Sequence, residues 1–235
     1  MSRDLASPAR VLAIGAHPDD VELYAGATLA KWAAAGAHVE LLVVTDGSKG
    51  SWDPGVRPPE LVARRHAEQH AAAVVLGADH VHFLDAVDGE LVADRAQLGA
   101  VCRIIRRVRP DVVVGHDPWK HYRLHPDHRE AGKLTVEGIV AARDPHFFPA
   151  DGTPHRPEHL LLFEAQEPDH VETVGAADVE RKLAALFCHH SQLLSTMGID
   201  VDAPDTETQR SAFVARVGAE IAERGGEAFK HLDDL

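Results

Sequence analysis

The chain has 235 residues, 45% of them hydrophobic and 26% charged, which is the composition of an ordinary globular protein. Its formal net charge of −13 disfavours nucleic acid or an anionic membrane surface as the main partner, because an acidic surface repels phosphate groups. Two cysteines are too few for a disulfide framework, and no stretch approaches the ~18 apolar residues of a membrane span, so we expect a cytoplasmic protein.

The first half of the chain alternates short apolar runs with segments of helical periodicity. In chain order the pattern predicts strand 10–16, helix 21–35, strand 39–45, loop 46–59, helix 60–76, strand 81–84, helix 93–109 and strand 111–115. Within helix 21–35, the residues at helical spacing are Leu23, Ala27, Ala30 and Ala34, and they are expected to share one face.

The second half predicts helix 126–142, strand 159–165 and helices 176–189 and 206–224. A basic run on helix 93–109 is expected on a solvated face, with an oligomer contact or an anion site as the alternative: Arg103, Arg106, Arg107 and Arg109. Alternating strands and helices favour an α/β fold with a doubly wound, mostly parallel sheet and helices on both faces. Without a repeat or a clear linker, we expect one domain over residues 1–235.

A first cluster of polar residues, Ala16-His17-Pro18-Asp19-Asp20, follows the first strand directly and opens the first helix. Open α/β sheets place their functional sites at the carboxyl ends of strands. His17 and Asp20 are three residues apart, so one turn can bring both side chains to the same point. Asp19 then remains as a second carboxylate.

A second cluster, His125-Pro126-Asp127-His128, follows the strand at 111–115 after a loop and also opens a helix. The carboxyl ends of parallel strands lie at one edge of the sheet, so the two clusters can meet. Imidazole and carboxylate ligands suit a catalytic Zn²⁺, although Fe²⁺ could occupy the same ligands. A helix cap or a turn explains either cluster alone equally well, but the pair favours a metal site.

At these residues the sequence resembles the PIG-L/LmbE family of zinc-dependent N-deacetylases, which act on N-acetylglucosaminyl conjugates and related amides. The motifs AHPDD at 16–20 and HPDH at 125–128 match the two signatures of that family. Weaker matches extend over nearly the whole chain. The resemblance implies a Rossmann-like fold, which agrees with the predicted alternation of strands and helices.

The resemblance also implies roles for individual residues. His17, Asp20 and His128 would bind zinc. Asp19 would be the general base for the attacking water, and His125 would polarise the substrate carbonyl or protonate the amine.

Further roles follow from the same resemblance. Asp127 would orient His125, and Arg65 and Asp88 fall where the family often contacts the sugar. Tyr24 departs from the family pattern, because it adds bulk where family members often have a glycine-rich segment. Tyr122 lies in the basic and aromatic loop before the second motif. It could assist the oxyanion or contact substrate, with a solvated loop as the alternative.

We therefore expect a zinc-dependent hydrolase that removes an N-acetyl group from a sugar conjugate, a small molecule. The alternatives are an amidase on a larger amide conjugate, such as a thiol-sugar conjugate or a glycosylated natural product, and a non-catalytic metal- or ligand-binding protein. Asp19 argues against the last, because a pure binding site does not need a second carboxylate beside Asp20. The sequence leaves the substrate and any homo-oligomer open.

Overall fold

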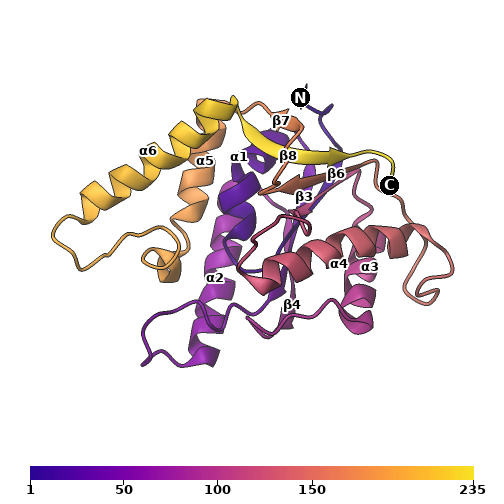
Figure 1. Ribbon diagram of the computed structural model, residues 1–235, viewed down its shortest axis with the longest axis horizontal. Coiled ribbons are helices and arrows are strands. Elements are labelled where there is room, and N and C mark those ends of the chain that lie inside the picture. Colours follow the sequence, from indigo (N-terminus) through magenta and orange to yellow (C-terminus); the bar gives the residue numbers. More distant parts are fainter.

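The structure, a computed structural model, describes residues 1–235 and contains one eight-stranded sheet with the order β1-β7-β8-β6-β5-β2-β3-β4 (Figure 1). The strands are β1 Ser2–Arg3, β2 Arg10–Gly15, β3 His38–Thr45, β4 His80–Ala86, β5 Val112–His116, β6 His159–Phe163, β7 His170–Glu172 and β8 Glu227–Leu232. The five strands from β6 to β4 are parallel to one another, whereas β8 is antiparallel to both β6 and β7. The sheet is therefore mostly parallel, as predicted.

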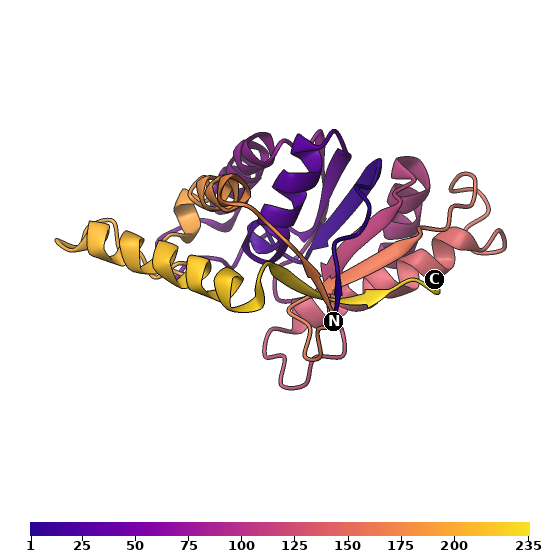
Figure 2. The ribbon, with the colours of Figure 1, turned by 90° about the horizontal axis from the view of Figure 1, so that it is seen from above.

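Six α-helices surround the sheet: α1 Asp20–Ala34, α2 Pro58–Leu76, α3 Arg95–Val108, α4 Pro126–Arg143, α5 Ala176–Leu186 and α6 Thr206–Arg224. Helices α1, α2 and α5 lie on one side of the sheet and α3 and α4 on the other (Figure 2). Helix α6 projects from the body and buries only Phe213 and Val217. None of these helices combines the length and the apolar character that crossing a membrane requires.

The alternation of side chains along β2 divides the core into two layers. Leu12 and Ile14 pack toward α3 and α4, and Val11 and Ala13 pack toward α1. Since successive residues of a strand point to opposite faces, a continuous apolar run is the pattern of a strand that is buried on both sides. The predicted parallel strands follow from this pattern, and the structure confirms them.

The predicted face of helix 21–35 is partly wrong. The side of α1 that packs on the sheet carries Val21, Ala25, Leu29 and Trp32, and the last predicted residue, Ala34, is exposed. Helix α1 also packs against α5 and α2, so apolar residues occur on several of its sides. A helix that is buried on several sides has no single apolar stripe from which its orientation can be predicted.

Strands β1, β7 and β8 were not predicted. β1 has two residues and β7 has three, which is too few for a periodic pattern. Strand β8 follows α6 and inserts between β6 and β7. Only its Glu227 and Phe229 are buried, so its alternation is too brief to distinguish a strand from a loop.

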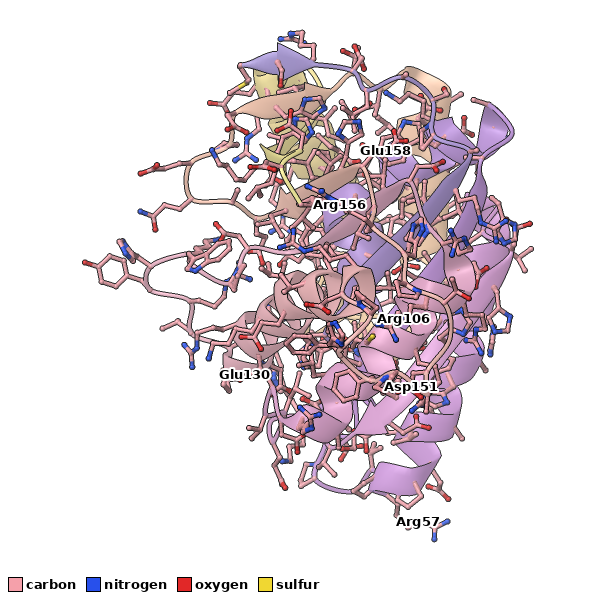
Figure 3. The ribbon with its side chains drawn as sticks, turned by 90° about the vertical axis from the view of Figure 1, so that its right-hand side faces the viewer. Arg57, Arg106, Glu130, Asp151, Arg156 and Glu158 are labelled. Atoms are coloured by element: carbon pink, nitrogen blue, oxygen red, sulfur yellow. The ribbon has the colours of Figure 1, made fainter.

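Arg106 is not on a solvated face, in contrast to the prediction for the basic run. It is buried in α3 (Figure 3), and its guanidinium donates hydrogen bonds to backbone carbonyls at the end of α4 and in the loop after it. The acceptors are the carbonyl oxygens of Ala141, Ala142, Asp144, Phe147, Phe148 and Gly152. The last turn of a helix leaves carbonyls without partners, and Arg106 supplies the donors that they need.

Candidate active site

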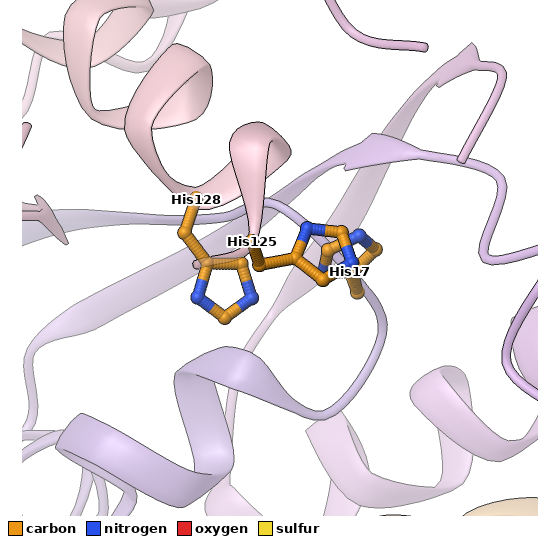
Figure 4. A group of neighbouring side chains, drawn as sticks. All are labelled: His17, His125 and His128. Atoms are coloured by element: carbon orange, nitrogen blue, oxygen red, sulfur yellow. The ribbon is translucent and has the colours of Figure 1, made fainter. Parts of the chain in front are cut away.

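The two polar clusters meet at one edge of the sheet. Strands β2 and β5 are adjacent and parallel, so the segment from β2 to α1 and the segment from β5 to α4 begin side by side. His17 lies in the first segment, and His125 and His128 lie at the start of α4. Their rings come together although more than a hundred residues separate them (Figure 4).

The three imidazole rings form a compact group. The ring centroid of His17 lies 4.5 Å from that of His125 and 5.2 Å from that of His128, and the His125 and His128 centroids are 5.0 Å apart. One nitrogen of each ring can be chosen so that all three atoms lie within 4.8 Å of one another. This is an arrangement that can hold a metal ion.

Asp20 lies between two of these histidines. Its Oδ2 is 3.4 Å from Nδ1 of His17, and its Oδ1 is 3.4 Å from Nε2 of His128. Asp20 thus contacts one histidine through each of its oxygens, and it also forms a group with His116 and His128 whose ligand atoms lie within 4.8 Å of one another. The three residues that the sequence predicted as ligands are therefore neighbours.

His116, to which the sequence analysis assigned no role, also contacts Asp20. This residue is the last of β5 and fully buried, and its Nε2 lies 3.1 Å from Oδ2 of Asp20. Its ring stacks on that of His128 with centroids 4.3 Å apart. Burial lowers the pKa of His116 to about 4, so the ring is neutral at pH 7. It can therefore hold Asp20 and stack on His128 without adding a positive charge beside them. Its position at the carboxyl end of a predicted strand was the available signal.

His17 is surrounded by carboxylates. In addition to Asp20, Oδ1 of Asp88 and Oδ2 of Asp127 each lie 3.2 Å from its Nε2. Burial opposes protonation of His17, but the carboxylates outweigh it and raise the pKa of His17 well above its ordinary value. For Asp20, burial acts to raise the pKa, and the imidazoles of His128 and His116 bring it well below the usual range.

The charges of the cluster fit a bound cation. Four buried carboxylates lie in or beside it: Asp19, Asp20, Asp88 and Asp127. Of these four carboxylates, only that of Asp19 forms an ion pair with an arginine or a lysine, which is Arg65 at 3.7 Å. Buried charges require compensation, and a divalent metal among these nitrogen and oxygen donors would supply it.

Asp127, which was expected to orient His125, forms no hydrogen bond or ion pair with it. Its Oδ2 is directed at His17 and accepts a hydrogen bond from the backbone N–H of Gly89 at 2.6 Å, and its Oδ1 accepts one from Leu91 at 3.3 Å. One oxygen of Asp127 and one ring nitrogen of His125 nevertheless lie within 4.8 Å of each other, in a group that also includes His17 and Asp88. The residue His125 is exposed, but the protein around its ring removes part of the ring's hydration. This partial desolvation, together with the nearby His17 and His128, lowers the pKa of His125.

Asp19 occupies a strained position beside the histidines. Its backbone φ of 97° lies in the left-handed region that residues other than glycine rarely adopt. Its N–H donates to Oε1 of Gln69 at 3.1 Å, and its Oδ2 accepts a hydrogen bond from the Thr196 hydroxyl at 3.0 Å. Burial raises the pKa of the Asp19 carboxyl, against the opposing effect of Arg65. Strained residues of this kind concentrate at functional sites, where the surrounding structure holds them in place.

Arg65 holds the loop that carries Asp19. It is buried, and its guanidinium donates to the carbonyl oxygens of Pro18 at 2.7 Å and Gly47 at 3.0 Å. A Cβ at Gly50 would lie 2.1 Å from the same guanidinium, so only glycine allows the loop after β3 to approach so closely. Arg65 thus connects the two loops around the site.

Tyr122 is not part of the site in this structure. Its side chain is 97% exposed, and its aromatic neighbour is His121, with a centroid distance of 6.3 Å. The loop between β5 and α4 turns outward at this residue, which has a positive φ of 57°. In this conformation the Tyr122 side chain points into solvent, which agrees with the solvated loop given as the alternative.

Behind His128 lies a charged pair that the sequence analysis missed. Oε2 of Glu164 is 3.6 Å from Nδ1 of His128 and forms an ion pair with Arg123, whose Nη1 is 3.1 Å from the same ring nitrogen. Burial acts to raise the pKa of Glu164, but His128, Arg123 and Lys120 lower it to about 2. Glu164 directly follows β6, at the same sheet edge as His17 and His116. Its place at a strand end was a signal, but the predicted strand extended over it.

The clusters face a cavity of about 300 Å³. His17, Asp19, Asp20, His125 and His128 line one part of it. Arg65, Asp88 and Lys49 line another part, so both residues expected near a sugar border the cavity. A substrate group in this cavity would contact the predicted ligands and Asp19 together.

Several known proteins are similar to this chain in sequence and in fold. The diacetylchitobiose deacetylase of Thermococcus kodakarensis is 37% identical over 188 residues, which cover 78% of this chain and 70% of that protein. The 1D-myo-inositol 2-acetamido-2-deoxy-alpha-D-glucopyranoside deacetylase of Kineococcus radiotolerans is 29% identical over 265 residues, covering 85% and 73%. The structure of N,N'-diacetylchitobiose deacetylase from Pyrococcus horikoshii superimposes with a TM-score of 0.84 at 28% identity, covering 96% of this chain and 84% of that one.

The sequence model of the PIG-L family, described as GlcNAc-PI de-N-acetylase, matches residues 12–139. That range contains both motifs, from His17 to His128, together with the strands that bring them together. The chain therefore belongs to the PIG-L family.

Proposed function

We propose that this protein is a zinc-dependent hydrolase that removes the N-acetyl group from an N-acetylglucosaminyl-type sugar conjugate. The observation that carries the proposal is the meeting of His17, Asp20 and His128 beside a further carboxylate, Asp19, in one cavity. The relatives named above are deacetylases of acetamido sugars, which supports hydrolysis of an N-acetyl amide bond. The continuous sheet across β1 to β8 supports a single domain over residues 1–235.

His17, Asp20 and His128 would hold the metal, with His116 and Glu164 supporting Asp20 and His128 from behind. A divalent cation in this place would act as a Lewis acid and lower the pKa of a coordinated water from ~15.7 towards ~7. Ion-ligating histidines commonly form a second contact to a carboxylate through the other ring nitrogen, as His128 does with Glu164.

Asp19 is the proposed general base. Its carboxylate lines the cavity and is not shared between histidines as Asp20 is, so it remains free to accept a proton from the attacking water. The Thr196 hydroxyl and Arg65 hold its two oxygens in place. This arrangement orients the base before substrate binds, which reduces the entropic cost of the step.

His125 is the proposed partner of the substrate oxygen and the leaving amine. Its exposed ring borders the cavity and has no hydrogen bond to Asp127, so an N–H of the ring can donate to the carbonyl oxygen. As the carbon–nitrogen bond breaks, the amine needs a proton, and the proton that Asp19 accepted from the water can reach it through the ring of His125. Arg65 and Asp88, on the cavity wall, are the proposed contacts for sugar hydroxyls.

The test measures metal content by mass spectrometry and acetate release from N-acetylglucosamine conjugates. We expect about one zinc per chain in the protein, lost in His17→Ala and in His128→Ala together with acetate release. His146→Ala, which changes an exposed histidine beyond the end of α4, is the control and should retain both.

Zinc content that is indifferent to both changes would contradict the shared site. Bound zinc with acetate release from bulky amides but not from acetylated sugars would instead favour an amidase on larger conjugates. Bound zinc with no hydrolysis of any amide would indicate a binding protein.

A further inference from the structure

Helix α2 directs a row of buried polar side chains at the segment that carries Asp19. Arg65, Glu68 and Gln69 are three and four residues apart on this helix, so they share one face, and all three are buried. Buried polar groups require hydrogen-bond partners, and each of the three has its partners in or near the active site.

Glu68 fixes the turn that follows α5. Its Oε1 accepts a hydrogen bond from the backbone N–H of Ser191 at 2.9 Å, and its Oε2 accepts one from the Ser191 hydroxyl at 2.6 Å. The same turn leads to Thr196, whose hydroxyl donates to Oδ2 of Asp19. Glu68 therefore reaches the side chain of Asp19 only through this turn.

Gln69 acts on the backbone of Asp19 directly. Its Oε1 accepts the hydrogen bond from the Asp19 N–H at 3.1 Å, and its Nε2 donates to Oε1 of Glu22 at 2.6 Å. These contacts fix the orientation of the amide, because a flipped amide would place a donor against the Asp19 N–H and an acceptor against the carboxylate. The peptide that Gln69 holds is the one with the strained φ of 97°.

Behind Gln69, Glu22 and His189 form a fully buried pair. Oε2 of Glu22 lies 3.7 Å from Nε2 of His189, and neither ring nitrogen of His189 has a hydrogen-bond partner. Burial acts to lower the pKa of His189, but the carboxylates of Glu22 and Asp19 outweigh it and raise the pKa. The imidazolium form of His189 compensates the buried charge of Glu22 and keeps that carboxylate in place as the acceptor for Gln69.

We propose that Gln69 is a positioning residue of the reaction: held by Glu22, it keeps the Asp19 peptide in its left-handed conformation and thereby directs the Asp19 carboxylate at the attacking water. This inference rests on the proposed function of Asp19 as the general base. Gln69 is not part of the cavity lining and does not touch substrate, so its loss should lower kcat and leave KM unchanged. A displacement of about 1 Å in a reacting group can cost ~10²-fold in rate.

The test measures kcat and KM for acetate release from N-acetylglucosamine together with zinc content. Gln69→Met keeps the length of the side chain and removes both hydrogen bonds. We expect kcat to fall by ~10–100-fold, with KM within about twofold and about one zinc per chain. Glu22→Gln combined with Gln69→Glu exchanges the amide and the carboxylate and retains both hydrogen bonds, so kcat should return to within about threefold of the unaltered value.

Gln209→Met is the matched control. Oε1 of Gln209 also accepts a hydrogen bond from an aspartate N–H, that of Asp200 at 2.7 Å, and its Nε2 donates to Asp205 at 3.0 Å. Gln209 is not in the cavity lining, so this variant should keep kcat and KM unchanged.

Three results would overturn the positioning role of Gln69. They are an unchanged kcat in Gln69→Met, a kcat that falls only in proportion to zinc content, and an exchange variant as slow as Gln69→Met. In the Asp19→Asn background Gln69→Met should lower kcat no further, because both changes act through the same carboxylate.

Amide hydrogen exchange, measured by NMR, separates this inference from the proposed function. The Asp19 N–H should exchange at least about tenfold faster in Gln69→Met and at the unaltered rate in Gln209→Met. This acceleration in a protein that releases no acetate would retain the positioning by Gln69 and refute the deacetylase. Acetate release with an unchanged exchange rate in Gln69→Met would refute the positioning and retain the deacetylase.

Discussion

Asp19 combines a backbone conformation with φ of 97° and a side chain beside three histidines. Asparagine tolerates the left-handed region at least as well as aspartate, so Asp19→Asn should fold normally while it removes the base. We expect kcat to fall by ~10²–10⁴ with zinc content unchanged. The measurements are acetate release and metal analysis.

Asp85→Asn is the matched control, because Asp85 is also a non-glycine residue with positive φ, 52°, but is exposed and pairs with His66. It should leave kcat unchanged. Normal turnover in Asp19→Asn would remove the assignment of Asp19 as the base.

Glu164 tests whether the residues behind His128 matter for the metal. Its carboxylate lies 3.6 Å from Nδ1 of His128, and replacing it by glutamine removes the negative charge while keeping the shape. We expect Glu164→Gln to weaken zinc binding by ~10–100-fold, measured by competition with a chelator of known affinity. The control is Glu167→Gln, at an exposed residue three positions later, and this variant should bind zinc as the unaltered protein does. Equal affinities in the two variants would indicate that Glu164 serves only Arg123 and Lys120.

At the scale of elements, Glu172 of β7 joins three segments. Its carboxylate accepts hydrogen bonds from the Leu5 N–H at 2.8 Å and from Lys31 of α1 at 2.5 Å, and lies 2.8 Å from Nε2 of His170. Burial acts to raise the pKa of Glu172, but these donors outweigh it and lower the pKa. The pKa of Glu172 is lower in the folded state than in the unfolded state. The ionised Glu172 carboxylate therefore stabilises the fold above the ordinary glutamate pKa of ~4.3, and this stabilisation is lost as the pH falls below that value.

We therefore expect Glu172→Gln to lower the free energy of unfolding by about 1–3 kcal/mol at pH 7, with the difference shrinking as the pH falls below ~4. Urea denaturation at a series of pH values measures it. Glu158→Gln, at an exposed glutamate without an ion pair (Figure 3), is the control. A difference that stays constant from pH 7 to the acid range would show that the charge of Glu172 is not the cause.

Arg106 offers a second prediction at this scale, since it connects α3 to the end of α4. Arg106→Ala leaves several carbonyls of that turn without a donor, and we expect a loss of about 2–4 kcal/mol in the free energy of unfolding. Arg103→Ala removes only an exposed pair with Asp151 and should cost less than about 1 kcal/mol. Equal denaturation midpoints for the two variants would contradict the role of Arg106.

For the whole molecule, metal binding should couple to folding. The ligands come from β2–α1 and from α4, so an ion that binds them stabilises the folded chain and not the unfolded one. At a free zinc concentration of 100 times Kd the gain is ~2.7 kcal/mol, or about 5–10 °C in Tm for a protein of this size. Chelator-treated protein should show this shift on adding zinc, and His128→Ala should not. A shift of the same size in His128→Ala would place the stabilising ion elsewhere.

Much of this molecule was predictable from local pattern. Apolar runs placed the parallel strands, and the residues at their carboxyl ends, His17, Asp20 and His128, indicated where the site would form. These signals are local because a strand buried on both faces must be apolar throughout, and a parallel sheet brings its strand ends to one edge. The sequence by itself thus determined the fold class, the family and the expected metal ligands.

Tertiary structure alone decided the contacts that depend on packing between distant segments. It paired Asp127 with His17, turned Tyr122 into solvent, and buried Arg106 under the end of α4. It also inserted β8 between β6 and β7. The physical reason is that side-chain direction, burial and the pairing of a short strand depend on what lies opposite in space, and one-dimensional periodicity carries no information about that.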